Sequence, residues 1–417
     1  MKFSKIPGSP ATGPHRWGGS SQLFLVSSIS LLVATLFTAC QLVSIDYVFL
    51  ATTGGTTKCA GGQIETYAVD SQSGAVRKAN PPVCSGGNTP VALAISPGYT
   101  NLYVANAADK TVVHFAVAEN GVLTSKDTVT LSSAPVSLAV NSSGNALYVV
   151  SGSTSVTLTA YALTSGTIGS VTAQQALTVP GFTSDSLVPT GVTALANGSA
   201  VYVTAYDMSA YNPGGTTTST ANPGWVFGFS AGSGGTLTAT AGSPYKAGVK
   251  PSGLAADPTS RFVYVTDFAS NQLIGYGVYS GEVLNFLLNG PFRTGAEPSS
   301  VAIDPRGKFM YISNALDSSV SAYVIDLATG TPSSAVNPTG SSTNSTDTQP
   351  AAIAIDPALG RYVYTANFLG NSISGFRLDP TAGTLIITQS TPYPSGSKPT
   401  ALVIVPHGNH SIQTVTP

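Results

Sequence analysis

Residues 298–314 read PSSVAIDPRGKFMYISN, and this stretch decides the fold. A proline-led apolar strand is followed by an Asp-Pro turn and then by a second apolar strand centred on Tyr311. Copies of the second, aromatic strand lie at Tyr47, Tyr103, Tyr148, Tyr202, Tyr264, Tyr311 and Tyr364. Copies of the first begin at Pro90, Pro135, Pro189, Pro251, Pro298, Pro350 and Pro399. Spacings of about 45 to 62 residues, with several short strands in each unit, are typical of β-propellers.

Two more strands complete each unit. Residues 320–325 alternate so that both faces of the strand are semi-apolar, as expected for a sheet packed between neighbouring sheets. A glycine marks the next turn in every unit, because tight hairpins favour a residue that accepts a positive φ. These glycines are Gly74, Gly121, Gly166, Gly235, Gly281, Gly330 and Gly383. We label the four strands of a unit A to D.

The ends of the repeat array predict how the ring closes. The chain enters at strand B, while residues 399–405 supply a strand A with no unit after it. We therefore predict an all-β, seven-bladed β-propeller with four-stranded antiparallel blades, closed by the C-terminal strand pairing into the N-terminal blade. The predicted boundaries are a signal peptide at 1–40, the propeller at 41–406 and a polar tail at 407–417.

Residues 1–40 carry targeting information. A basic lead precedes an apolar stretch at 23–39, which ends in Phe-Thr-Ala-Cys40. This resembles a bacterial lipoprotein signal, in which Cys40 would be lipidated and become the mature N-terminus. An ordinary cleaved signal and an uncleaved anchor are the alternatives. We expect an exported protein of the bacterial cell envelope, in the periplasm or at the outer membrane, which contacts membrane only through a lipid anchor.

Composition restricts the partners. Charged residues make up 8% of the chain and the formal net charge is −1, which argues against nucleic acid. We expect a monomer that needs no cofactor. Cys59 and Cys84 are predicted to form a disulfide, as an oxidising compartment allows. No metal site is predicted, because the four histidines, His15, His114, His407 and His410, are dispersed in the sequence.

The repeated Pro-led strand, the Asp-Pro turn and the Tyr-Val-x-Asn strand are similar to the YVTN repeat family and to the lactonase-like seven-bladed propellers, which include the 6-phosphogluconolactonases. The similarity covers residues 47–405 and implies the propeller fold. Enzyme members carry Gly-Pro-Arg-His at the start of a strand A and Asn-Glu at the end of the following strand B. Here the best-matching unit reads EPSS at 297–300 and then Asn314-Ala315, and residues 349–351 read QPA where the family has Gln-Pro-Arg. No catalytic residue is therefore assigned.

Loop lengths indicate a different kind of site. Long inserts fall at Ala51 to Gly62, Asp207 to Gly224 and Thr331 to Gln349, all in B-to-C or D-to-A connections, which emerge on one face of a propeller. We call this side the long-loop face. The candidate binding residues there are Tyr206, Met208, Tyr211, Trp225, Asp267, Phe268, Asn314 and Asn367. A core position for Trp225 and a turn-capping role for the asparagines are the structural alternatives.

Three functions remain open at this stage. The first is a binding scaffold for a protein or carbohydrate partner at the long-loop face, supported by the aromatic residues near 206–225. The second is a lactone hydrolase of the 6-phosphogluconolactonase type with a degenerate or relocated site, as the family resemblance implies. The third is a structural component of the envelope.

Overall fold

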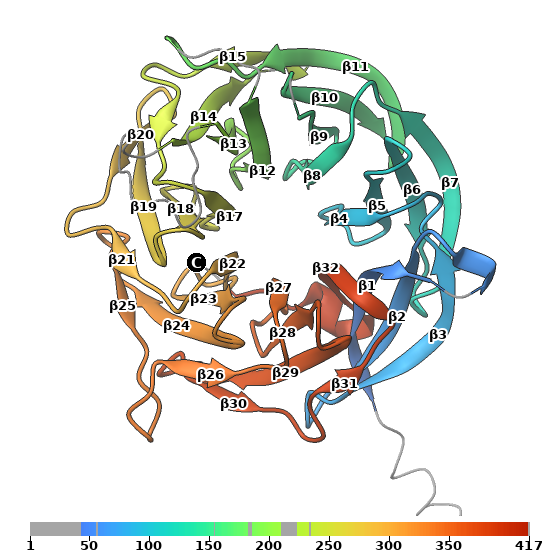
Figure 1. Ribbon diagram of the computed structural model, residues 1–417. Coiled ribbons are helices and arrows are strands. Elements are labelled where there is room, and N and C mark those ends of the chain that lie inside the picture. Colours follow the sequence, from blue (N-terminus) through green and yellow to red (C-terminus); the bar gives the residue numbers. More distant parts are fainter. Residues whose placement is uncertain are drawn as a thin grey trace, which may run out of the picture. The chain divides into compact units, whose positions relative to one another are not determined.

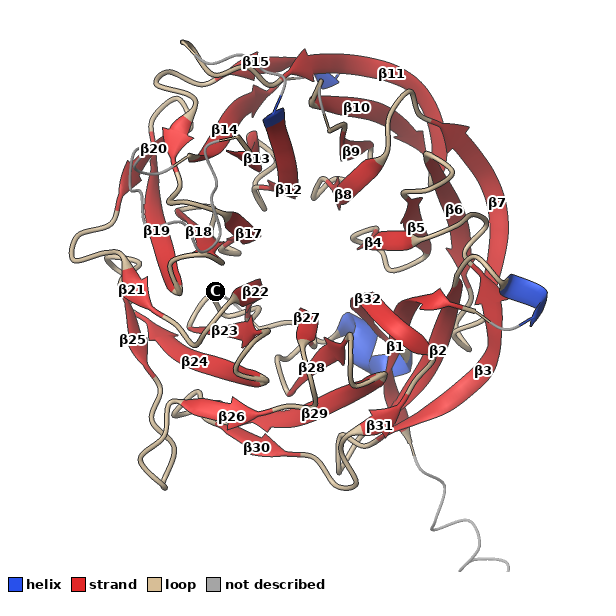
Figure 2. Ribbon diagram, viewed as in Figure 1, coloured by secondary structure: helices blue, strands red, loops and turns tan. Residues whose placement is uncertain are grey.

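The computed structural model describes residues 43–55, 57–153, 155–181, 186–209, 223–232 and 235–415 of the protein. Residues Ser44–Pro417 form one compact unit. Seven antiparallel sheets in this unit are arranged as blades around a central channel, which confirms the predicted all-β propeller (Figure 1). Figure 2 shows how small the helical part is. In the described part of the chain, no helix is long and apolar enough to cross a bilayer.

The strands follow the chain from blade to blade. Blade 1 contains β1 (Ser44–Gly54), β2 (Gln63–Asp70), β3 (Val76–Cys84) and the last strand, β32 (Ser397–Pro406). Blade 2 contains β4 (Pro90–Ile95), β5 (Asn101–Asn106), β6 (Thr111–Val117) and β7 (Leu123–Thr130). Blade 3 contains β8 (Pro135–Val140), β9 (Ala146–Ser151), β10 (Thr157–Thr164) and β11 (Thr167–Ala176).

The other four blades have a fourth strand in two pieces. Blade 4 contains β12 (Leu187–Ala194), β13 (Ala200–Asp207), β14 (Gly224–Ala231), β15 (Leu237–Ala239) and β16 (Tyr245–Lys246). Blade 5 contains β17 (Pro251–Ala256), β18 (Phe262–Asp267), β19 (Gln272–Tyr279), β20 (Val283–Phe286) and β21 (Phe292–Arg293). Blade 6 contains β22 (Pro298–Ile303), β23 (Phe309–Asn314), β24 (Ser319–Ile325), β25 (Pro332–Ser334) and β26 (Thr343–Ser345). Blade 7 contains β27 (Pro350–Ile355), β28 (Tyr362–Asn367), β29 (Ser372–Leu378), β30 (Leu385–Ile387) and β31 (Tyr393–Pro394). Two 3₁₀ turns, η1 (Thr57–Cys59) and η4 (Gly408–Ile412), lie near the two ends of the ring unit.

The fourth strands of blades 4 to 7 are split in two, and this corrects one prediction that we made from the loop lengths. The stretch from Thr331 to Gln349 is not an insert on the long-loop face alone, because β25 and β26 both lie within it and both pair with β24. Residues 51–54 likewise belong to β1, so the first long connection is shorter than predicted. The sequence did not predict these short strands, because two or three residues are too few to show an alternating pattern.

Ring closure follows the prediction. The C-terminal strand β32 pairs antiparallel with β1, with Val48 opposite Ile404 and Phe49 opposite Val403. Next to this pair, the buried Glu65 carboxylate accepts hydrogen bonds from the Tyr67 hydroxyl at 2.6 Å and from the backbone N–H of Gly396 at 2.9 Å. The first and last segments of the ring are therefore joined by both a strand ladder and a buried polar contact.

The first copy of the aromatic strand lies two residues away from the position we assigned. In the other blades the repeated tyrosine pairs with the residue four positions after the strand A proline, as Tyr311 pairs with Ala302. In blade 1 that partner is Val403, and it faces Phe49 rather than Tyr47. Tyr47 instead packs beside Gly121, as Phe309 packs beside Gly383. Tyr47 and Phe49 are both aromatic and lie in the same strand, so the sequence did not distinguish the two registers.

Buried tyrosines of five blades each form a hydrogen bond to the next blade. The hydroxyl of Tyr311 donates to the carbonyl of Gly383 at 2.7 Å, and that of Tyr364 donates to Gly74 at 2.6 Å. Tyr103, Tyr202 and Tyr264 make the corresponding bonds to Gly166, Glu282 and Gly330. Burial raises the pKa of Tyr103 to about 12, so its hydroxyl stays protonated and donates. The seven predicted turn glycines all have positive φ, between 68° and 88°, which presents the turn carbonyl to the neighbouring blade.

We predict that Tyr311→Phe lowers the free energy of unfolding by about 1 to 2 kcal/mol, because the Gly383 carbonyl loses a buried donor while the ring stays in place. Urea denaturation followed by circular dichroism measures this. Tyr279→Phe is the matched control, because Tyr279 is 60% exposed, and it should change stability by less than about 0.5 kcal/mol. Equal stability of the two variants would contradict a stabilising role for the interblade bond.

Candidate functional site

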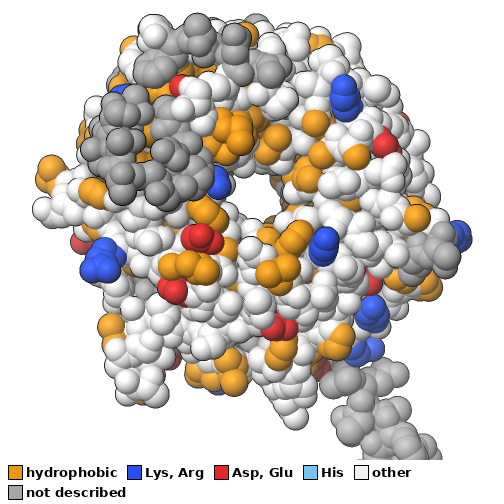
Figure 3. All heavy atoms as spheres, viewed as in Figure 1, with side chains coloured by type: hydrophobic (Ala, Val, Ile, Leu, Met, Phe, Trp, Pro, Cys, Tyr) orange, Lys and Arg blue, Asp and Glu red, His pale blue; other side chains and the backbone are white. Residues whose placement is uncertain are grey.

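Strand A is the innermost strand of every blade, and it starts on the long-loop face. Figure 3 looks onto this face and shows the central opening with basic and acidic side chains around it. The residue that precedes each strand A proline therefore lies at the channel mouth. We call these seven residues the mouth ring: Thr89, Ala134, Val188, Lys250, Glu297, Gln349 and Lys398. All seven are half-buried or exposed.

The mouth ring has a polar half. Strands β17, β22, β27 and β32 follow one another around the channel, and the ring members at their starts are Lys250, Glu297, Gln349 and Lys398. The other three positions of the ring are uncharged and small or apolar. One carboxylate, one amide and two ammonium groups therefore share one side of the mouth. This combination can position a polar substrate that carries a carbonyl and several hydroxyls.

Three of the predicted binding residues converge on Lys250. The Asp267 carboxylate, which is fully buried, accepts hydrogen bonds from the backbone N–H groups of Val249 and Lys250, both at 2.9 Å. The Lys250 ammonium lies 4.3 Å from the centroid of the Phe268 ring and 5.9 Å from that of Tyr206. Asp267 therefore fixes the backbone of a basic residue, and the two rings hold its charged end by cation–π contact.

Close packing also fixes the approach to Lys250. Gly248 has a φ of +74°, and a Cβ there would lie 2.2 Å from a carboxylate oxygen of Asp267. Gln272 donates a further hydrogen bond to Asp267 at 3.0 Å. Asp267 thus has donors on both oxygens and acts as a turn-organising group, not as a base exposed to substrate.

The backbones of the other polar members are fixed from the preceding blade. The Asn271 side chain accepts the N–H of Glu297 at 2.8 Å, and Asn371 accepts the N–H of Lys398 at the same distance. Glu297, Gln349 and Lys398 have positive φ, between 52° and 57°, so they share one backbone conformation. Among the described residues, no side chain makes a hydrogen bond or ion pair with the Glu297 carboxylate. Glu297 is therefore the best-placed base at the mouth.

The strand-end asparagines are buried and do not line the mouth, so a binding role for Asn314 and Asn367 is not supported. Asn314 is 0% exposed and donates to the hydroxyls of Ser319 at 3.0 Å and Ser321 at 2.9 Å. Asn367 makes the same pair of bonds to Ser372 and Ser374. In blades 6 and 7 these amides therefore link strand B to strand C. This is similar to the turn-capping role that we gave as the structural alternative.

The aromatic loop of blade 4 is only partly described. Trp225 is 2% exposed and belongs to the core between blades 3 and 4, with Lys246 5.3 Å from its ring centroid. Met208 is 59% exposed just after β13, and Tyr206 is buried. Tyr211 lies outside the described residues. Of the four candidates in this loop, Met208 is the one that the structure places on the surface.

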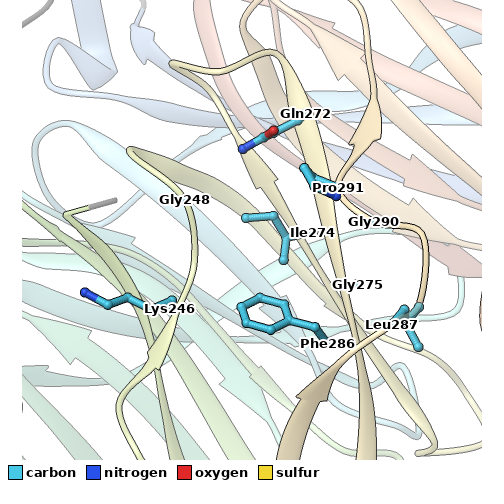
Figure 4. A pocket seen from close by; sticks show the side chains of 9 residues that line it. All are labelled: Lys246, Gly248, Gln272, Ile274, Gly275, Phe286, Leu287, Gly290 and Pro291. Atoms are coloured by element: carbon cyan, nitrogen blue, oxygen red, sulfur yellow. The ribbon is translucent and has the colours of Figure 1, made fainter. Parts of the chain in front are cut away.

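A pocket opens beside the mouth, between blades 4 and 5 (Figure 4). It has a volume of about 530 Å³, and Lys246, Gln272, Ile274 and Phe286 contribute to its lining. The Phe286 ring is 60% exposed and stacks on Tyr276 with 5.1 Å between ring centroids. The exposed Phe286 ring offers a flat apolar face that suits a sugar ring, while the Lys246 side chain points away from it (Figure 4).

Cys59 and Cys84 form a disulfide that joins the B-to-C connection of blade 1 to the end of β3. Cys40 lies outside the described residues.

The positions at which the enzyme motif is replaced lie at the start of β22 and at the end of β23. Ser299, where enzyme members have arginine, donates to the carbonyl of Pro350 at 2.6 Å and contacts the Ser313 hydroxyl at 2.8 Å. Ser300 is half-buried in β22, and Ala315 is buried. The hydroxyl of Ser299 ties neighbouring inner strands together, so these positions serve the ring and do not supply a base or a cation.

The fold and the polar mouth define a seven-bladed propeller of the lactonase type. The family described as "Lactonase, 7-bladed beta-propeller" matches residues 51–207 and 243–412. The chain belongs to this family. A search of the curated proteins gives no significant match.

Solved structures of the same fold share little sequence with this chain. The periplasmic gluconolactonase of Pseudomonas aeruginosa superposes with a TM-score of 0.69 at 17% identity, covering 87% of this chain and 99% of the other. A proposed 6-phosphogluconolactonase of Bacteroides fragilis gives a TM-score of 0.67 at 19% identity, covering 87% and 98%. A proposed 6-phosphogluconolactonase of Bacteroides uniformis gives 0.68 at 18%, covering 87% and 99%.

Sequence reasoning found the residues that support Lys250 but missed the mouth ring itself. A signal was present, because each ring member directly precedes a strand A proline. The residue at that position differs between units and is lysine, glutamate or glutamine. A search for repeats finds only positions at which the residue type is kept.

Proposed function

We propose that this protein hydrolyses a sugar lactone at the mouth of its channel. The observation that carries the proposal is Glu297, which stands where enzyme members have glycine before the strand A proline and lies between Lys250 and Gln349 in the mouth ring. Family membership and the lactonase assignments of the structural neighbours support it.

The proposed reaction uses this chain's own side chains. The Glu297 carboxylate accepts a proton from water as the water oxygen bonds to the lactone carbonyl carbon. An ammonium of the mouth ring, from Lys250 or Lys398, stabilises the oxyanion that forms. The ring C–O bond then breaks, and the departing alkoxide takes the proton back from Glu297 to give the open hydroxy acid.

We predict that Glu297→Gln lowers kcat for glucono-1,5-lactone by about 100-fold or more, since the amide cannot accept the proton. The assay is acid release at constant pH, with the spontaneous rate subtracted. Glu119→Gln is the matched control, because Glu119 is exposed and lies in a turn on the opposite face. Wild-type protein with no turnover above the spontaneous rate would refute the lactonase proposal, and an unchanged kcat in Glu297→Gln would refute the role of Glu297.

A binding scaffold is the second candidate, favoured by the pocket beside the mouth and by the lost enzyme motif. In this case a carbohydrate stacks on Phe286 without being hydrolysed. We predict that Phe286→Ala weakens oligosaccharide affinity about tenfold, measured by calorimetry after a glycan screen. Leu288→Ala, which removes an 82% exposed side chain two residues after Phe286, should leave affinity unchanged. Loss of affinity in both variants would point to a disturbed loop and not to ring stacking.

We also propose that the protein is exported and anchored by a lipid on Cys40. The signal-like sequence at 1–40 and the Cys59–Cys84 disulfide support export. A periplasmic neighbour of the same fold is consistent with it.

The expected outcome is a membrane-bound protein whose first residue is Cys40 with attached acyl chains, detected by mass spectrometry of the N-terminal peptide. Cys40→Ser should release the protein in soluble form. A soluble wild-type chain that begins at another residue would contradict the anchor.

A further inference from the structure

A buried polar cluster lies on the face opposite the mouth, where the chain's tail returns to the ring. Asp46 at the start of β1, Asp356 in the turn after β27 and His410 in η4 are far apart in sequence. Asp46 and Asp356 are 0% exposed, and His410 is 4% exposed. One candidate ligand atom from each residue lies within 4.8 Å of the others.

Asp46 is buried beside His410, whose Nε2 lies 3.4 Å from one of its carboxylate oxygens. Neither of its carboxylate oxygens makes a hydrogen bond within the described residues. In the other blades this strand position is held by exposed or half-buried residues such as Arg261, Lys308 and Arg361. A buried carboxylate with unused oxygens requires a positive partner.

His410 points one nitrogen at both carboxylates. Its Nε2 lies 3.1 Å from an oxygen of Asp356 and 3.4 Å from an oxygen of Asp46. Its Nδ1 lies 2.8 Å from the side-chain oxygen of Gln413, which can only accept. Nδ1 therefore carries a proton, so in the neutral ring the Nε2 lone pair faces the two carboxylates.

These distances fit a metal ion. Ligand bonds of about 2.1 Å at tetrahedral angles separate two donor atoms by about 3.4 Å, close to both measured separations. A histidine that binds a metal usually donates its other N–H to an oxygen acceptor. Here Gln413 is that acceptor. Asp356 also accepts the backbone N–H of Ala358 at 2.9 Å and of Arg361 at 3.0 Å, so its carboxylate is already oriented.

We propose that Asp46, Asp356 and His410 bind a divalent transition-metal ion, with Zn²⁺ as the probe. The ion fixes the C-terminal tail to both blades that meet at the ring closure, since β1 belongs to blade 1 and Asp356 to blade 7. The other ionisable groups near Asp46 and Asp356 include Arg361 and three tyrosines, Tyr99, Tyr362 and Tyr364. The alternative occupant of the same space is a proton on Nε2.

The test is calorimetric titration of ZnCl₂ into purified full chain that has been stripped with EDTA. We expect one Zn²⁺ per chain in the wild type, together with a rise in the thermal midpoint. His410→Ala and Asp46→Asn should weaken zinc affinity at least 100-fold. Gln413→Ala, which keeps all three ligands, should weaken it about tenfold. His407→Ala is the matched control from the same tail and should bind as wild type.

Two results would overturn the metal site. The first is a stripped wild type that binds no Zn²⁺, with nitrogen NMR showing a protonated His410 Nε2 at pH 7. The second is zinc binding that His410→Ala leaves unchanged, which would place the ion elsewhere. A folded circular dichroism spectrum for each variant keeps loss of binding distinct from loss of structure.

Discussion

The structure depends on the hydrogen bond from a buried strand B tyrosine to the turn carbonyl of the next blade. Each blade is a small sheet whose faces are both apolar, and hydrophobic burial by itself has no preferred direction, which leaves freedom in the angle between blades. A phenol that must find an acceptor inside the core removes that freedom. Tyr364 to Gly74 repeats the bond across the ring closure, so the closure has the same geometry as the other blade junctions.

Blade 1 shows what replaces this bond where it is absent. Phe49 has no hydroxyl, and the Gly121 carbonyl is approached instead by the Thr66 hydroxyl at 3.4 Å. The same blade carries additional fastenings: the disulfide, the buried Glu65 and the β1–β32 ladder. The Asp46 cluster lies at this blade too. Covalent and polar links are therefore concentrated where the chain's two ends must be held together.

Functional side chains can vary on this ring without a change in the fold. The mouth ring uses positions whose backbones are fixed by carbonyl and asparagine contacts, so side chains there can vary from Thr89 to Glu297 at little cost to the fold. At the family's arginine position, the Ser299 hydroxyl links neighbouring inner strands through its hydrogen bond to the Pro350 carbonyl. Glu297, two residues before the family's arginine position, is the carboxylate that the proposed acid–base chemistry uses.

The sequence by itself determined the seven blades, their strand order, the ring closure and the turn glycines, because these features repeat and repetition can be read without coordinates. It also selected Asp267, Phe268 and Tyr206 as site-like. Only the tertiary structure decided that those residues support Lys250, that Asn314 and Asn367 are buried, and that Phe49 takes the place of Tyr47. Only it brought His410 to Asp46 and Asp356. The physical reason is that a site consists of residues that differ between repeats and that ring closure brings together in space. Neither property produces a pattern along the sequence.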